Sequence, residues 1–173
     1  NWDVNAFYIE AEYAPTQVGN VPDTNYTHGA YDQNYIYMND QNAGTGPTDY
    51  ISFDFNSAGG TYYLWARAIA WDGSSDSLWY RIDNGAWTNT AVGITTNRTW
   101  QWKGGVNIGA VSAGKHTFSI GRRETPYLDA VFLTNDSTYT AATIPIDNNA
   151  GYSLHRSVSS GGMFQPVNGF YDN

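Results

Sequence analysis

Residues 51–70, ISFDFNSAGGTYYLWARAIA, decide the fold class of this chain. Apolar and polar side chains alternate cleanly over residues 51–55, and a second, longer run of the same kind covers residues 62–70 after the pair Gly59-Gly60. A period of two is the pattern of a strand with one buried face, because successive side chains point to opposite sides of a sheet. Adjacent glycines interrupt such a run. The stretch therefore predicts two strands separated by a break.

Similar short runs continue along most of the chain, whereas the i, i+3, i+4, i+7 spacing of an amphipathic helix is missing. Asn-Gly within residues 83–85 tolerates positive φ and predicts a hairpin turn, and residues 112–115 predict another turn. Many short strands with turns roughly 8–12 residues apart are typical of a sandwich or barrel. We predict an all-β, jelly-roll β-sandwich of two antiparallel sheets. Its further strands are expected at 7–13, 35–38, 78–82, 86–90, 116–121 and 128–134.

The strand signals end near residue 138, so residues 1–138 are predicted to form one module. Residues 139–173 contain the pairs Asn148-Asn149, Ser159-Ser160 and Gly161-Gly162, which favour loops. We expect this loop-rich C-terminal extension either to pack on the sandwich or to lead into a linker.

Composition excludes several classes of function. Acidic residues outnumber basic ones 16 to 8, the formal charge is −8, and no Lys/Arg cluster is present, which argues against nucleic acid and anionic membranes as partners. The absence of Cys excludes disulfides, thiolate metal sites and a cysteine nucleophile. With 7 Trp, 14 Tyr and 7 Phe in 173 residues, the chain carries many rings that require either a core or a binding surface.

Three acidic residues occupy positions where charge is costly. Glu10 and Glu12 would share one face of the first strand, and Asp129 begins an apolar run with Val131 and Leu133 on its side. Like charges in such places need a cation or an arginine. Calcium, which takes 6–8 oxygen ligands, suits these carboxylates, and the alternative is a solvated or Arg-paired edge charge.

Four motifs occur in order along most of the chain. They are IEAE at 9–12, GTYYLWAR at 60–67, AGKHTF at 113–118 and LDAV at 128–131. Together they resemble the carbohydrate-binding modules of families 6 and 35, over about residues 7–136. The resemblance implies a jelly-roll sandwich without catalysis, attached to a polysaccharide-degrading enzyme, and a structural calcium held by Glu10, Glu12 and Asp129.

Sugar binding needs aromatic rings that stack on the C–H face of the sugar and polar groups at its rim. Loops at the end of a rigid sandwich are the best places for both. The sequence and the resemblance together nominate eight residues, although the spacing of Trp100 and Trp102 leaves open which of that pair faces the ligand and which the core. The candidates are Tyr31, Asn34, Trp71, Asp72, Trp100, Trp102, Arg123 and Glu124.

We therefore predict a non-catalytic, monomeric carbohydrate-binding module of a larger, secreted or cell-surface bacterial enzyme. A neutral polysaccharide or oligosaccharide is the expected partner. A structural or adhesive module of a surface protein is the first alternative. A small polysaccharide lyase or glycoside hydrolase is the second, although the two Glu of residues 10–12 are not opposed across a cleft as glycosidase carboxylates are.

Overall fold

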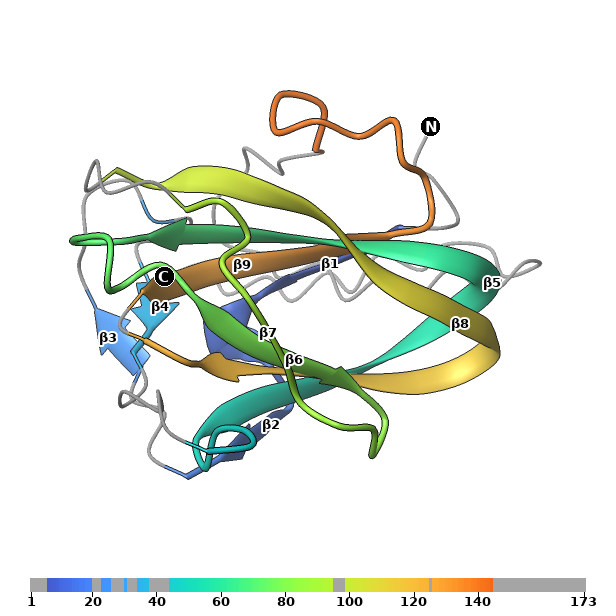
Figure 1. Cartoon of the computed structure of the whole chain (residues 1–173), viewed down its shortest axis with the longest axis horizontal. Coiled ribbons are helices and arrows are strands. Elements are labelled where there is room, and N and C mark those ends of the chain that lie inside the picture. Colours follow the sequence, from blue (N-terminus) through green and yellow to red (C-terminus); the bar gives the residue numbers. More distant parts are fainter. Residues whose placement is uncertain are drawn as a thin grey trace, which may run out of the picture.

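The computed structural model describes residues 6–19, 23–25, 30, 34–37, 44–94, 99–124 and 126–144 of the chain. Nearly all regular structure in these residues is β (Figure 1). The elements are β1 (Ala6–Glu10), the 3-10 turn η1 (Ala11–Tyr13), β2 (Thr16–Val18), β3 (Asp23–Asn25), β4 (Asn34–Ile36), β5 (Tyr50–Ile69), β6 (Leu78–Ile82), β7 (Thr88–Thr90), β8 (Gln101–Arg122) and β9 (Tyr127–Thr134). In the part of the chain that the structure describes, no helix has the length and hydropathy needed to cross a bilayer.

All strand pairs are antiparallel, in the order β3-β4-β9-β5-β8-β6-β7, with β1 added to β9 and β2 to β5. The predicted all-β sandwich is confirmed, but its two layers are one continuous hydrogen-bonded sheet. The 20-residue β5 and the 22-residue β8 run through both layers and fold over together at the right of Figure 1.

The fold-over lies where the sequence predicted strand breaks. Gly59 and Gly60 have φ of +88° and +107°, and Gly114 has φ of +127°, a region that glycine enters without a Cβ clash. The two strands nevertheless stay paired there, from Ser57 opposite Gly114 to Gly60 opposite Val111. The predicted turns are therefore bends, because two strands that bend together keep their hydrogen bonds.

The main core lies between the two layers. Phe53 packs on Phe7 and Phe118 with ring centroids 4.8 and 5.4 Å apart, and all three rings are buried. Leu64 and Ala66 face this core from the returning half of β5. Each large side chain that is fully buried in this way contributes about 1.5–3 kcal/mol to stability.

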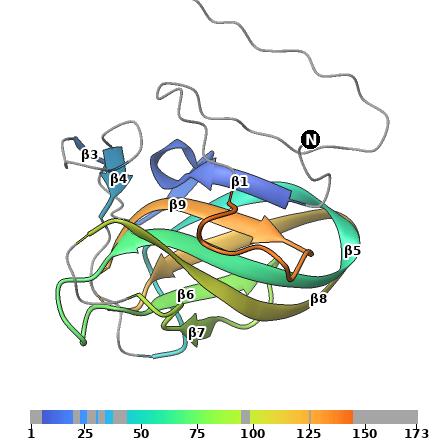
Figure 2. The same cartoon turned by 90° about the horizontal axis from the view of Figure 1, so that it is seen from above.

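A second apolar cluster covers the outer face of the layer that contains β1, β9 and β5. Trp102, Ala130, Phe132 and Ile144 are buried there, and four partly buried side chains pack against them: Ala6, Tyr8, Trp65 and Tyr139. Figure 2 shows the segment after β9 (orange) folding back over this face. Residues 139–144 thus pack on the sandwich, whereas residues 145–173 of the expected extension lie outside the described residues.

Candidate functional site

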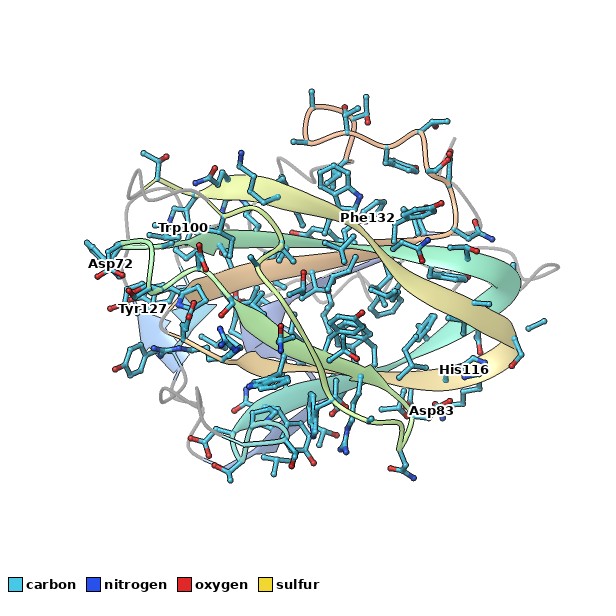
Figure 3. All side chains as sticks on the ribbon, viewed as in Figure 1. Asp72, Asp83, Trp100, His116, Tyr127 and Phe132 are labelled. Atoms are coloured by element: carbon cyan, nitrogen blue, oxygen red, sulfur yellow. The ribbon has the colours of Figure 1, made fainter. Side chains whose placement is uncertain are left out.

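Strand topology gathers aromatic residues at one end of the sandwich. In the order β4-β9-β5-β8, antiparallel pairing brings the end of β4, the start of β9, the end of β5 and the start of β8 to the same edge. Tyr37, Tyr127, Trp71 and Trp100 occupy these four positions. We call these four residues the aromatic platform. Trp100 and Tyr127 lie at the left of Figure 3, with the neighbouring Asp72.

Tyr127 is the centre of the aromatic platform. The edges of Tyr37 and Trp71 meet its ring at centroid distances of 5.4 and 5.6 Å and interplanar angles of 63° and 77°. Tyr35, which is only 8% exposed, stacks on Tyr127 at 5.1 Å and touches Trp100 at 5.5 Å. Tyr37 and Trp71 are 37% and 41% exposed, so these two rings are open to solvent, whereas the Tyr35 ring that packs on Tyr127 is buried.

Arginines fix two of these rings. The guanidinium of Arg122, which is fully buried, lies 4.4 Å from the ring centre of Tyr37, and that of Arg67 lies 5.5 Å from Trp100. Such cation–π contacts hold a ring in one orientation. Arg67 also forms a buried ion pair with Asp129. The rings are therefore held in place before any ligand arrives.

Two loops meet beside Trp71 and Tyr127. Arg123 pairs with Glu124 at 3.0 Å and donates to the Ser77 hydroxyl at 2.9 Å, while the backbone N–H of Asp76 donates to Glu124 Oε2 at 3.2 Å. The backbone N–H groups of Arg123 and Glu124 both donate to the Ser77 carbonyl. These contacts tie residues 122–124 to residues 72–77. We call this set of contacts the loop clasp.

Ionisation within the loop clasp is unusual. Burial, a hydrogen bond with Glu124 and the charge of that carboxylate raise the pKa of Asp76. Burial acts in the same direction on Glu124, but hydrogen bonds from Ser77 and Asp76 and the Arg123 charge outweigh it and lower the pKa of that carboxyl. The pKa values of these two neighbouring carboxyls are therefore shifted in opposite directions.

The structure brings only some of the predicted sugar-binding residues together. Trp71 and Trp100 belong to the aromatic platform, and Arg123 and Glu124 belong to the loop clasp. Asp72 lies beside them, but its Oδ1 accepts hydrogen bonds from the Ser74 N–H at 2.9 Å and the Ser75 hydroxyl at 2.7 Å, so it shapes its own loop. Tyr31 and the side chain of Asn34 lie outside the described residues.

Trp102 is the member of the Trp100 and Trp102 pair that faces the core, a point that the sequence left open. It lies in β8 opposite Arg67, not in a polar loop, and is 6% exposed in the second apolar cluster, where its ring approaches Tyr8 at 6.1 Å. The polar residues that precede it in the sequence made this segment resemble a loop, whereas pairing with β5 keeps it extended. Sequence reasoning also missed Tyr37 and Tyr127, whose signal was their position at predicted strand ends.

The three carboxylates proposed for calcium do not lie together on one strand face: Glu10 and Glu12 lie at the end of β1 and in η1, and Asp129 lies in β9. β1 ends at Glu10, and Glu12 belongs to η1 (closed by Ala14 N–H to the Ala11 carbonyl at 3.2 Å), so the two do not share a strand face as predicted. The ladder between β1 and β9 ends with Glu10 opposite Ala130, next to Asp129, which is the extra residue of a bulge in the pairing of β9 with β5. Glu10 and Glu12 are 9% and 8% exposed, and Asp129 is held by Arg67.

These residues are a partial fit to calcium. Buried carboxylate oxygens such as those of Glu10 and Glu12 are the hard donors that the ion prefers. Within the described residues, however, no three His, Cys, Asp or Glu side chains are grouped closely enough to hold a metal. Backbone carbonyls would have to complete the shell around the two glutamates.

A groove of about 470 Å³ at the open edge between the layers contains Ser112, His116 and Asp83. Nδ1 of His116 lies 2.8 Å from Asp83 Oδ2, and its Nε2 lies 3.2 Å from Ser112 Oγ and 3.0 Å from the Ser112 carbonyl oxygen. A carbonyl only accepts, so Nε2 must carry a proton. A serine nucleophile needs a lone pair there, so the contacts fit a structural link better than a catalytic triad.

Comparison with known proteins identifies the fold. No family model matches the sequence, and no curated protein matches it. Among solved structures, the C-terminal family 6 carbohydrate-binding module of a laminarinase from Zobellia galactanivorans is similar at TM-score 0.58 and 14% identity, covering 75% of this chain and 99% of that one. A family 35 module from Clostridium thermocellum gives TM-score 0.59 and 17% identity, covering 73% and 97%.

A family 35 module also occurs in a larger similar chain, a GH26 β-(1,4)-mannanase from Podospora anserina. Its TM-score is 0.55 and its identity is 20%, over 76% of this chain and 28% of that one. Whole modules of both families therefore superimpose on most of this chain. The chain has the β-sandwich fold of the family 6 and family 35 carbohydrate-binding modules, as the four sequence motifs predicted.

Proposed function

We propose that this protein is a non-catalytic carbohydrate-binding module whose ligand stacks on the aromatic platform. The observation that carries the proposal is the exposure of Trp71 and Tyr37 around Tyr127 at one end of a rigid sandwich. Exposed rings cost free energy in water, and rings held edge-on to a central ring present a fixed apolar surface. The C–H face of a sugar can cover such a surface while its hydroxyls stay at the rim.

The polar groups beside the aromatic platform suit the same ligand. Glu124 and Arg123 lie in the loop that precedes Tyr127, and charged donors and acceptors there can reach sugar hydroxyls. The fold supports this proposal, because similar structures are named as carbohydrate-binding modules, some within glycoside hydrolases. We extend it to a secreted or cell-surface protein in which this module is attached to a polysaccharide-degrading enzyme.

Affinity electrophoresis and titration calorimetry test the proposal with laminarin, β-1,3-galactan, β-1,4-mannan and dextran. Those polymers follow from the names of similar structures. We expect Trp71→Ala and Tyr37→Ala each to weaken binding about tenfold or more, equivalent to about 1.4 kcal/mol. The matched control is Trp87→Ala, which removes an indole that packs on Tyr50 and Arg81 in the other layer. Binding that survives both platform variants would refute the site.

We also propose a structural calcium bound by Glu10 and Glu12, with Asp129 as a third candidate. Their burial favours a cation nearby, since a buried carboxylate is costly without a compensating charge. Calcium would fix the start of the chain against β9. Adding calcium should raise the melting temperature, and EDTA should lower it. Glu12→Gln should abolish that response. An unchanged melting temperature with and without EDTA would refute the calcium proposal.

A further inference from the structure

We propose that Asn84 is a site of spontaneous deamidation, in which the backbone nitrogen of Gly85 attacks the Asn84 side chain and converts residue 84 to aspartate or isoaspartate. The site belongs to the turn between β6 and β7. Figure 3 labels Asp83 of this turn at the right, at the end of the sandwich opposite Trp100 and Tyr127. The reaction needs only a base and water, so this inference does not depend on the proposed sugar site.

The first residue of the turn is firmly held. Asp83, rather than Asn84 or Gly85, has the positive φ that the sequence pattern predicted here, at +53°. The Asp83 N–H donates to the Thr117 carbonyl at 2.7 Å, and Asp83 Oδ1 accepts from the Thr117 N–H at 2.9 Å. Asp83 Oδ2 lies 2.8 Å from Nδ1 of His116. Both the backbone and the side chain of Asp83 are therefore fixed to β8.

The next two residues of the turn are much less constrained. Asn84 and Gly85 are both exposed, and no hydrogen bond to the Asn84 side chain is present in the described part of the chain. The Gly85 N–H donates to the Ile82 carbonyl at 3.0 Å, and this bond must open before the nitrogen can react. A Cβ added at Gly85 would meet only the same carbonyl oxygen, so the nitrogen is uncrowded. Opening one hydrogen bond at an exposed turn is a local fluctuation of low cost.

The reaction is an intramolecular acyl transfer, which is fast when the two reacting groups are neighbours. A base removes the proton from the Gly85 nitrogen, and the nitrogen forms a bond to Cγ of Asn84. The side-chain amide leaves as ammonia with a proton from water, and a succinimide ring remains. Water then opens the ring at one of its two carbonyls. Opening at the side-chain carbonyl gives aspartate, and opening at the main-chain carbonyl gives isoaspartate.

The other asparagines with described side chains are less suited to this reaction. Asn107 and Asn135 are held by hydrogen bonds to backbone groups at 2.9 and 3.1 Å. Asn56 and Asn89 lie within paired strands. Each of the four is followed by a residue whose side chain crowds the attacking nitrogen, whereas Asn84 is followed by glycine. The structure therefore singles out Asn84 among them.

Isoaspartate would change the turn more than aspartate would. It adds one atom to the main chain between Asp83 and Gly85, and it places a new carboxylate beside that of Asp83. The hydrogen bond from Gly85 to Ile82 then loses its geometry, and repulsion between the two carboxylates weakens the hold of Asp83 on Thr117. We expect the unfolding equilibrium constant of the isoaspartate form to be about fivefold larger, the value of one ordinary hydrogen bond.

The experiment incubates the purified chain in mildly alkaline buffer, both folded and unfolded in urea, and follows its tryptic peptides by mass spectrometry. Cleavage after Arg81 releases residues 82–98, in which fragmentation locates the change. An isoaspartyl methyltransferase with labelled S-adenosylmethionine detects the isoaspartate. Asn168, which is also followed by glycine, lies outside the described residues and is measured in its own peptide. Urea denaturation of the modified fraction measures its stability.

Asn84 should react in the folded chain within about tenfold of its rate in urea, because one hydrogen bond must open. Asn107 and Asn135 should be protected by folding. Gly85→Ala should slow the reaction several-fold by crowding the nitrogen, and Asn84→Gln should stop it, since glutamine would have to form a larger ring. The matched control is Asn56→Gln, which changes an exposed asparagine of β5 and should leave the rate unchanged.

Two results would overturn the inference. One is protection of Asn84 by folding to the same extent as Asn107 and Asn135. The other is an equal rate in Gly85→Ala and the unmodified chain. An isoaspartate form with the stability of the unmodified chain would overturn the structural consequence. Polysaccharide binding at the opposite end of the sandwich should be the same before and after modification, so failure of either proposal is distinguishable from failure of the other.

Discussion

Replacing Arg67 with Met tests the most consequential buried charge in the molecule. Arg67 is 8% exposed and Asp129 is fully buried, and the two form an ion pair on the outer side of the layer that supports Trp100. Met keeps the volume of the stem but leaves the Asp129 carboxylate without this cation. Removing one partner of a buried pair typically costs about 3–5 kcal/mol, because the remaining charge is still out of water. For a domain with a total stability of about 5–15 kcal/mol, this is a large fraction.

Urea denaturation of the purified domain measures the effect, and a double-mutant cycle assigns it. Asp129→Leu alone removes the carboxylate that pairs with the Arg67 guanidinium. The double variant Arg67→Met with Asp129→Leu removes both charges from an apolar setting. The double variant should therefore be more stable than the sum of the two single losses predicts, by about 2 kcal/mol or more. Measurement with and without calcium separates the two counter-ions that have been considered for Asp129.

Two results would refute this reasoning. A cost below about 1 kcal/mol for Arg67→Met is the value of an exposed pair and would mean that Asp129 is solvated or neutralised by another cation. Full additivity in the cycle would mean that the two side chains stabilise the fold independently. If calcium addition restores Arg67→Met to its original stability, Asp129 is a metal ligand, as the sequence suggested.

Further predictions address the rest of the structure. Truncation after residue 138 should destabilise the domain by about 2–5 kcal/mol in urea denaturation, since it uncovers Phe132 and Trp102, and an unchanged midpoint would make 139–144 dispensable. Gly104→Ala should be severely destabilising, because the added Cβ would lie 2.3 Å from the Leu64 carbonyl oxygen. The Cβ of Gly109→Ala would meet open space, so this variant should lose only about 1–2 kcal/mol of stability, from its positive φ. Equal losses of stability in the two variants would contradict this packing. Hydrogen bonds from the Thr117 N–H and His116 lower the pKa of Asp83 in the folded chain. The ionised Asp83 therefore stabilises the fold above the pKa that this residue has in the unfolded chain, and this stability is lost as pH falls through the lowered pKa of the folded chain. Asp83→Asn should remove this stability, and identical acid unfolding curves for the two proteins would argue against the contact. A fluorophosphonate probe should not label Ser112, and labelling that is lost in His116→Gln would overturn the structural role of that groove.

Local pattern was sufficient for most strands and insufficient at three places. Residues 78–82 were predicted with the observed bounds because both their alternation and the following turn are local features. The glycines at 59–60 and 114 were taken for breaks, since a bend that keeps its pairing has the same local residues as a turn. β8 was missed over 101–111, where Gly104, Gly105 and Gly109 lower strand propensity and only pairing with β5 decides the conformation.

The sequence by itself determined the fold class and named two rings of the site. Alternation with period two is a local property, so an all-β sandwich and the inward face of β5 could be derived from residues alone. The order of motifs was enough to predict the modules that the fold resembles. Trp71 was identified from its place at the end of a predicted strand, and Trp100, together with Trp102, from the resemblance to the carbohydrate-binding modules.

Only the tertiary structure decided how those residues meet. Strand order, which no local pattern encodes, places the ends of β4, β9, β5 and β8 at one edge and so adds Tyr37 and Tyr127 to the two tryptophans. Burial separated Trp102 from Trp100, although the two are only two residues apart. Partners distant in sequence also fixed the charges, joining Arg67 to Asp129 and Asp76 to Glu124. Charge and ring contacts depend on distance in space, and the folded chain sets that distance.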